Sequence, residues 1–258
     1  MSNFPLASIL DKKSLIWHFC ITSIKLRYRG TYLGVLWSAL EPLLMFVLLY
    51  VVFSSIRETT KEDFAIYLIT GIMFYHLFVK GTMAGLGSIV NNSSLLKSFN
   101  LKKEFFPVVA TGSTTLLMFA TLVVFFGLMP VFDFSPTITI LFLPIVIVLL
   151  LFLILGISYF LSLINVLLRD IQQFWGIFSY ALIFVTPIFW HIEDVDGILV
   201  AIHNVNPLGQ IVELGHMIVF NQIPSLEQWT YASVLVFIIF IAGFVFFQKF
   251  ESKIIERL

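Results

Sequence analysis

The most constraining feature of this 258-residue chain is a series of apolar segments, each long enough to cross a lipid bilayer. A helix needs roughly 20 apolar residues to cross about 30 Å of hydrocarbon. Hydrocarbon offers no hydrogen-bond partner to a backbone, so each crossing segment should be an α-helix. The sequence therefore predicts an all-α integral membrane protein with six transmembrane helices per protomer, at about 34–56, 64–86, 107–131, 138–164, 172–190 and 230–249.

The composition agrees with this class, because 59% of the residues are hydrophobic and only 12% are charged. A soluble domain of this size needs a more charged surface. The formal net charge is zero, which gives no general attraction to nucleic acid. Cys20 is the only cysteine, so an internal disulfide framework is excluded. The first 30 residues lack the compact apolar core and small-residue cleavage site of a signal peptide.

The basic residues are sorted between the two sides of the predicted membrane. Twelve of the 15 Lys and Arg fall on one side, only Arg57 and Lys61 fall on the other, and Lys80 lies within a span. Since basic loops stay in the cytoplasm, we expect a multi-pass protein of the cytoplasmic (inner) membrane with both termini inside. A five-span alternative would place the C-terminal basic residues outside and spoil this sorting.

The segments outside the spans suggest two domains and two distinctive loops. Residues 1–33 are expected to form an N-terminal cytoplasmic domain with an amphipathic interface helix, and residues 34–258 a single transmembrane domain. The inner loop 87–106 alternates apolar and basic residues, which predicts a surface helix able to dock another protein. The outer loop 191–229 contains two apolar runs too short to cross, so we expect re-entrant outer helices between spans five and six. A small folded cap is the alternative.

Two charged residues fall within predicted spans, where an unpaired charge is costly. Glu41 lies about two turns into the first span, and Lys80 lies near the inner end of the second. We predict that they pair or face a polar path; simple snorkelling of Lys80 to the headgroups is the alternative. Pro42 should free a backbone carbonyl one turn earlier and kink the first span.

The sequence contains no motif that specifically indicates a catalytic site. It has no phosphate-binding loop, and we expect Gly81, Gly85 and Gly87 to allow close helix packing instead. His191 and Asp196 have a spacing found in some acyltransferases, but such a two-residue match arises easily by chance.

Aromatic residues are the other candidates for a functional role. Aromatic faces stack on the C–H faces of sugars, although a phenylalanine facing lipid needs no such explanation. The candidates for contacts of this kind with a sugar are Trp37, Phe46, Tyr50, Phe53, Trp175 and Phe178.

Several short motifs occur together in a characteristic order. They are Arg27-Tyr-Arg-Gly-Thr-Tyr-Leu-Gly-Val-Leu-Trp37, then Glu41-Pro-Leu43, Leu168-Arg-Asp-Ile171, Thr186-Pro-Ile-Phe189 and Asn206-Pro-Leu208. In these positions the chain resembles the membrane subunit of type-2 ABC exporters, in the branch that exports O-antigen, capsular polysaccharide or teichoic acid. The resemblance covers essentially the whole chain, with Thr186 standing where many members have Ser.

The resemblance implies a homodimer that works with two copies of a separate ATP-binding subunit. ATP and Mg would be bound by that partner, with no cofactor in this chain, and the chain itself would not be an enzyme. The ATPase-coupling candidates are Leu95, Leu96, Phe99, Arg169 and Asp170. The substrate would be a polysaccharide on a polyprenyl-diphosphate lipid, exported for lipopolysaccharide biosynthesis or a similar surface polymer.

The candidates for guiding the lipid diphosphate are Arg27, Arg29, Glu41 and Lys80. The alternative for both arginines is positive-inside anchoring of the N-terminal helix. Alternative functions are export of a drug or of a small lipid-linked oligosaccharide, and membrane acyl or glycosyl transfer. A secondary transporter would usually show more spans and ionisable groups at the membrane midplane.

Overall fold

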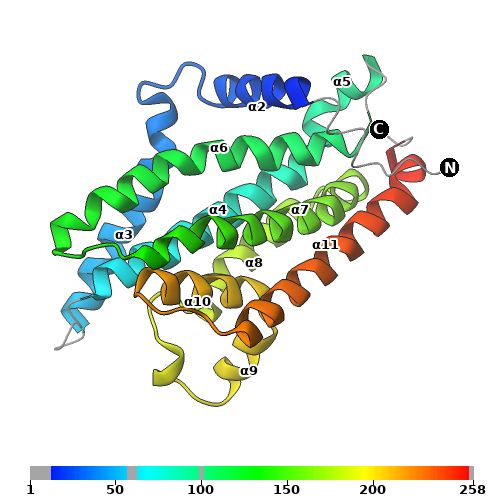
Figure 1. Cartoon of the computed structure of the whole chain (residues 1–258). Helices are drawn as coiled ribbons and strands as arrows, with labels where there is room; N and C mark the ends of the chain where they lie inside the picture. The colour runs from blue at the N-terminus through cyan, green and yellow to red at the C-terminus, as the bar shows by residue number, and fades with distance from the viewer. Residues whose placement is uncertain (1–12, 57–62, 99–101, 256–258) are drawn as a thin grey trace.

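The computed structural model describes residues 13–56, 63–98 and 102–255, which form long helices packed side by side (Figure 1). Five of these helices are long and apolar enough to cross a membrane. They are α3 (Trp37–Ile56), α4 (Phe64–Gly87), α6 (Phe105–Leu128), α7 (Leu143–Leu167) and α11 (Leu226–Ile255). The prediction of an all-α, multi-pass membrane protein is confirmed.

The remaining predicted span contains α8 (Ile171–Val185), which is apolar but has only 15 residues. At about 1.5 Å per residue this helix is roughly 22 Å long, short of the bilayer core. It ends at Val185 because Pro187 favours extended backbone at Thr186, where φ is −103° and ψ is 137°. The apolar sequence predicts a span that continues to residue 190, which is longer than the helix observed.

Helix α4 forms the centre of the bundle, with 83% of its most apolar stretch buried. It contacts α3, α6, α7, α8 and α10 (Pro207–Val219). A Cβ atom at Gly81 would lie 2.7 Å from Ile154 Cγ2, and one at Gly85 would meet Ser158, so both glycines let α7 approach closely. The packing prediction is confirmed for these two glycines, whereas Gly87 faces Asn91 of the following turn.

The same device joins α7 to α11. A Cβ atom at Gly156 would lie 2.6 Å from Phe240 Cα, and one at Gly243 would meet the backbone of Gly156. Small residues on both helices therefore bring the two backbones into contact.

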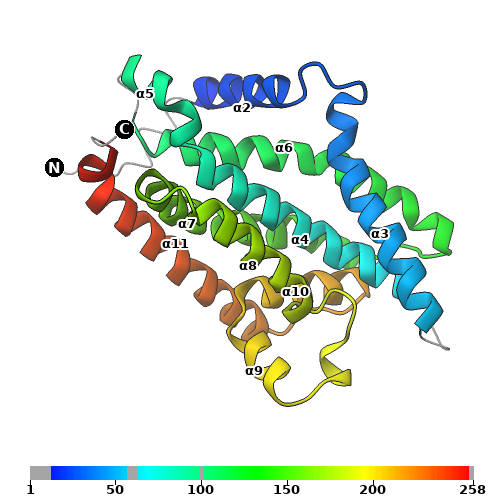
Figure 2. The same ribbon diagram turned by 180° about the vertical axis from the view of Figure 1, so that it is seen from behind.

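One end of the bundle carries α2 (Lys13–Arg27), η2 (Val90–Asn92) and α5 (Ser93–Ser98). The start of α2, α5 and the end of α11 lie at this end in both views (Figures 1 and 2). Helix α2 packs Phe19 and Cys20 against Phe105 and Val109 of α6. The apolar side of the predicted interface helix is therefore covered in part by protein.

The opposite end carries the 3-10 turns η3 (Pro130–Phe132), η4 (Ile138–Phe142) and η5 (Ile192–Asp194), together with α9 (Ile198–Val205) and α10. The 3-10 turn η1 (Gly34–Leu36) directly precedes α3 at the start of the first span. Helix α10 is packed against α4, α7 and α11, whereas α9 lies at the edge of the bundle (Figure 1). The two apolar runs of the outer loop thus form helices with different degrees of burial.

Candidate functional site

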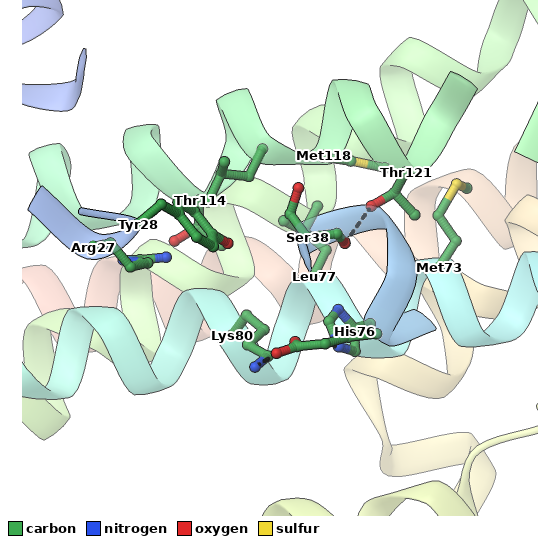
Figure 3. A pocket seen from close by; sticks show the side chains of 12 residues that line it. Arg27, Tyr28, Ser38, Met73, His76, Leu77, Lys80, Thr114, Met118 and Thr121 are labelled. Carbon is green, nitrogen blue, oxygen red and sulfur yellow. Dashed lines mark hydrogen bonds and ion pairs between the residues drawn. The ribbon is translucent and has the colours of Figure 1, made fainter. Parts of the chain in front are cut away.

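A pocket of about 250 Å³ lies where the end of α2 meets α3, α4 and α6 (Figure 3). The end of α2, α3 and α4 each contribute at least one charged residue, whereas α6 contributes only uncharged threonine and apolar side chains. The residues that line the pocket are Arg27, Tyr28, Ser38, Glu41, Met73, His76, Leu77, Lys80, Thr114, Leu117, Met118 and Thr121.

The centre of the pocket is an ion pair between the first two spans. Lys80 Nζ lies 2.6 Å from Glu41 Oε2, and His76 Nε2 lies 3.4 Å from the same oxygen. The pairing predicted for Glu41 and Lys80 is therefore confirmed. His76 and Lys80 stand one turn apart on α4, so both reach the same carboxylate. The side chains of Lys80 and Glu41 remain 47% and 42% exposed, which leaves both open to a ligand or a partner.

The backbone beside Glu41 is shaped by Pro42, which lies inside α3. Because proline has no N–H, it cannot donate the usual helical hydrogen bond to the carbonyl four residues earlier, at Ser38. Thr121 of α6 donates its hydroxyl to this carbonyl oxygen, with an Oγ1–O distance of 3.2 Å (Figure 3). The carbonyl freed by Pro42 thus joins α3 to α6 at the pocket wall.

The approach from α2 to α3 depends on two glycines. Gly30 has φ of +78° and Gly34 has φ of +53°, both in the left-handed region that other residues rarely adopt. The resulting turn places Arg27 and Tyr28 at the pocket. Burial raises the pKa of the Tyr28 phenol above its usual value, so this hydroxyl is neutral at physiological pH.

The structure brings together three of the four charged candidates, namely Arg27, Glu41 and Lys80. Arg29 is exposed and does not line the pocket. Sequence reasoning missed the place of His76 in the site. The signal available was its position four residues before Lys80, on the same side of one helix.

The aromatic candidates fall into buried and exposed groups. Phe46 is 3% exposed, and Trp175 is 9% exposed and donates its indole N–H to Thr82 Oγ1 at 3.0 Å. Packing within the protomer accounts for both positions. Trp37 and Phe178 are 38% and 43% exposed, so they present aromatic surface outside the protomer core.

The remaining two aromatic candidates stack on neighbouring rings. Tyr50 stacks on Phe46 with ring centroids 5.5 Å apart, and Phe53 stacks on Phe189 at 4.8 Å. This second contact joins α3 to the segment that follows α8.

The coupling candidates lie at the end of the bundle that carries α5. Leu95 and Leu96 are partly buried and pack against the cluster that contains Phe106 and Phe247. Arg169 and Asp170 are exposed in the short turn between α7 and α8. Phe99 lies outside the described residues.

Two of the quoted motifs meet near the opposite end of the bundle. Asn206 donates its amide to Thr186 Oγ1 at 3.2 Å and accepts from the backbone N–H of Leu208 at 3.1 Å, which caps α10. The Tyr67 hydroxyl donates to the carbonyl oxygen of Trp190 at 2.8 Å. The bond from Tyr67 thus gives a carbonyl oxygen of the non-helical backbone after α8 a hydrogen-bond partner.

His191 has a packing role in this region. Its ring stacks on Tyr67 with centroids 4.1 Å apart, and its Nδ1 lies 3.6 Å from Asp194 Oδ2. Asp196, the partner that the acyltransferase spacing suggested, is exposed. Among the described residues, there is no group of three His, Cys, Asp or Glu side chains that could hold a metal ion.

Bundle and pocket together define a multi-pass membrane protein with a charged pocket between its first two spans. Residues 14–220 match the family model described as ABC-2 type transporter, and the chain belongs to this family of ABC transporter membrane proteins. It is 23% identical over 236 residues to the O-antigen export system permease protein RfbA of Klebsiella pneumoniae, covering 91% of each chain. It is 24% identical over 238 residues to the protein of the same name from Myxococcus xanthus, covering 89% of this chain and 90% of the relative.

Proposed function

We propose that this chain is the permease subunit of an ABC transporter that exports O-antigen, a lipid-linked polysaccharide, across the cytoplasmic membrane. The observation that carries the proposal is the likeness to O-antigen export permeases along about nine-tenths of both chains. The quoted motifs are spread from the α2–α3 turn to the start of α10, in keeping with a likeness that is not confined to one segment.

The charged pocket is the proposed site for the diphosphate of the lipid carrier. Its volume of about 250 Å³ suits a headgroup and excludes a long glycan. Arg27 can bind phosphate oxygens through its planar guanidinium, and Lys80 adds a second positive charge. In the free protein Glu41 neutralises Lys80, and His76 remains beside Glu41 when Lys80 turns to the phosphate. After this exchange Glu41 keeps His76 as a polar neighbour and Lys80 gains the phosphate, which lowers the cost of holding both charges at the membrane.

A second copy of the chain is proposed to complete the export path. Helices α3 and α8 flank α4 on one side of the bundle (Figure 2). Their outward residues form an exposed apolar surface, and Lys80 and Met83 of α4 are exposed as well. The apolar residues exposed on the two helices include Leu44, Val47, Leu48, Val51, Phe174, Ile177, Phe178, Tyr180 and Phe184. Pairing of two such faces gives a symmetric dimer whose interface includes both charged pockets.

Orientation and coupling follow from the ends of the bundle. We place the end with α5 in the cytoplasm, with both termini, because most basic residues lie there. A separate ATPase subunit, two copies per dimer, would bind ATP and Mg and dock on α5 and on the Arg169-Asp170 turn. In this arrangement α8 and the segment to Trp190 form the fifth of six spans, and α9 and α10 are re-entrant from outside.

The alternatives receive no specific support from the described contacts. His191 pairs with Asp194 and not with Asp196, so the arrangement expected of the acyltransferase reading is not formed. Export of a drug or of a small lipid-linked oligosaccharide would use the same fold, and the full-length likeness to O-antigen permeases favours the long glycan.

Deletion of the gene in its natural host tests the function. Surface O-antigen should disappear, while polymer on its lipid carrier accumulates inside the cytoplasmic membrane. Return of the wild-type gene should restore surface polymer. Normal surface glycan in the deletion strain would refute the proposal.

A further inference from the structure

A second cavity, separate from the charged pocket, lies between α2 and the adjacent sides of α6 and α7. Its volume is about 790 Å³, and it shares no lining residue with the charged pocket. The lining is mainly apolar, and includes Ile16, Trp17, Leu116, Leu151, Phe152 and Leu155. Volumes of about 300–1,000 Å³ are typical of sites for small molecules and cofactors. We call this cavity the α2 groove.

The α2 groove follows the direction of the spans. On α6 it extends from Val108, about 5 Å from the start of the helix, to Leu116, about 17 Å from it. On α7 it extends from Leu155, about 18 Å from the end of the helix, to Val148, about 28 Å from it. The groove therefore leads from the end of the bundle that carries α5 toward the middle of the membrane, as a lipid acyl chain does.

Polar groups lie on the α2 and α6 sides of this apolar lining. Lys13 and Ser14 of α2 line the groove, and no salt bridge involves Lys13 within the part of the chain described. Thr111 of α6 also lines the groove and is only 6% exposed, yet its hydroxyl has no hydrogen-bond partner among the described residues. The Thr111 hydroxyl itself is shielded, so the charged group that the groove offers to a ligand is Lys13.

We propose that the α2 groove binds an acyl chain of an anionic phospholipid of the cytoplasmic leaflet. The lipid phosphate lies at Lys13, and the acyl chain follows the apolar lining supplied by α6 and α7. The positive charge at the rim selects an anionic headgroup over a zwitterionic one. A second copy of the chain is a poorer fit, because the exposed faces of α3 and α8 that suit a dimer belong to other helices.

This lipid would steady α2 on the bundle. Helix α2 meets α6 through a small cluster around Cys20, Phe105 and Val109, and the groove lies beside that cluster. Since α2 ends at Arg27, an occupied groove also holds that arginine at the charged pocket.

Trp17 provides a direct probe, because it lines the groove and is 55% exposed. The full-length chain is placed in phosphatidylethanolamine nanodiscs with increasing amounts of phosphatidylglycerol brominated on its acyl chains. The difference in quenching between the wild type and Trp17→Phe isolates the signal of Trp17. We expect this signal to saturate at a lower fraction of brominated phosphatidylglycerol than of brominated phosphatidylcholine.

Two variants and a matched control complete the test. Lys13→Gln should weaken phosphatidylglycerol binding by about fivefold. Lys25→Gln removes an equally exposed charge of α2 that does not line the groove, and should leave binding unchanged. Thr115→Phe places a ring in the groove and should abolish saturable quenching.

Several results would overturn the proposal. Quenching that rises in proportion to lipid content, equally for both lipids, means ordinary contact with bulk lipid. Equal binding by Lys13→Gln and Lys25→Gln removes the role of Lys13, and both exposed substitutions leave the fold intact. Attachment of a photoreactive residue at position 17 to residues 1–12 of the same chain would mean that protein, not lipid, fills the groove.

Discussion

The hydrogen bond from Thr121 to the Ser38 carbonyl oxygen makes a quantitative prediction about the pocket wall. Thr121→Val keeps the shape of the side chain but removes the donor, and leaves a buried carbonyl that Pro42 has already deprived of its helical partner. A buried polar group left without a partner costs about 1–3 kcal/mol. Measured hydrogen bonds between membrane helices average about 0.6 kcal/mol and reach about 1.7. We therefore expect Thr121→Val to lower the free energy of unfolding by about 1–2 kcal/mol.

The explanation is tested by restoring the missing helical donor. In a Pro42→Ala background the backbone N–H of residue 42 can bond to the Ser38 carbonyl, so Thr121→Val should then cost about 1 kcal/mol less. The four proteins of this cycle are compared by denaturant unfolding in mixed micelles. Thr114→Val is the matched control, because the Thr114 hydroxyl donates to Ala110 O within its own helix. Equal costs of Thr121→Val in both backgrounds would refute the reasoning.

Three further predictions concern other contacts. Gly243→Leu should lower the yield of folded protein on fluorescence-detected chromatography, because a side chain at this position meets the α7 backbone. Gly127→Leu is the control and should leave the yield unchanged, because a Cβ atom at Gly127 meets nothing within 4 Å. Asn206→Ala should lower the free energy of unfolding by about 1 kcal/mol in the same micelle assay, since it removes the cap of α10; no change would argue against this cap. Burial raises the pKa of Cys20 to about 11, so maleimide should label this single cysteine slowly at pH 8. Labelling should be faster in Phe19→Ala, because this substitution loosens the packing of α2 on α6. Equally fast labelling of the wild type and the variant would contradict the docking of α2.

Five of the six predicted spans coincide with long apolar helices, and these spans and the central ion pair could be predicted because their physical causes are local in sequence. A run of about 20 apolar residues has few soluble alternatives, and a charge such as Glu41 or Lys80 within it needs a partner. Only a few charged residues fall within the predicted spans, so each has few possible partners there.

Contacts between distant segments could not be predicted in the same way. Pro42 predicts that the Ser38 carbonyl lacks its helical donor. Nothing near Pro42 in sequence identifies the new donor as Thr121, which lies 83 residues from Ser38. The bond between Asn206 and Thr186 likewise depends on how α10 meets the end of α8. The end of α8 at Val185 could have been predicted from Pro187, because proline disfavours helix at the residue before it. The apolar run continues to Trp190, however, and suggested a longer span.

We propose that the pocket of Arg27, Glu41 and Lys80 holds the diphosphate of a lipid-linked glycan. The most direct test is to express Lys80→Met and Arg27→Ala in the deletion strain. Three amounts are then measured: permease in the membrane, polymer at the surface and polymer retained on its carrier. Lys25→Met serves as the control, because that exposed lysine does not line the pocket. If the pocket binds the diphosphate, we expect both pocket variants to show normal permease levels with polymer trapped inside the cell. The control should show normal export. Normal surface polymer in both pocket variants, or a fall in permease level that by itself explains the loss, would contradict the proposal.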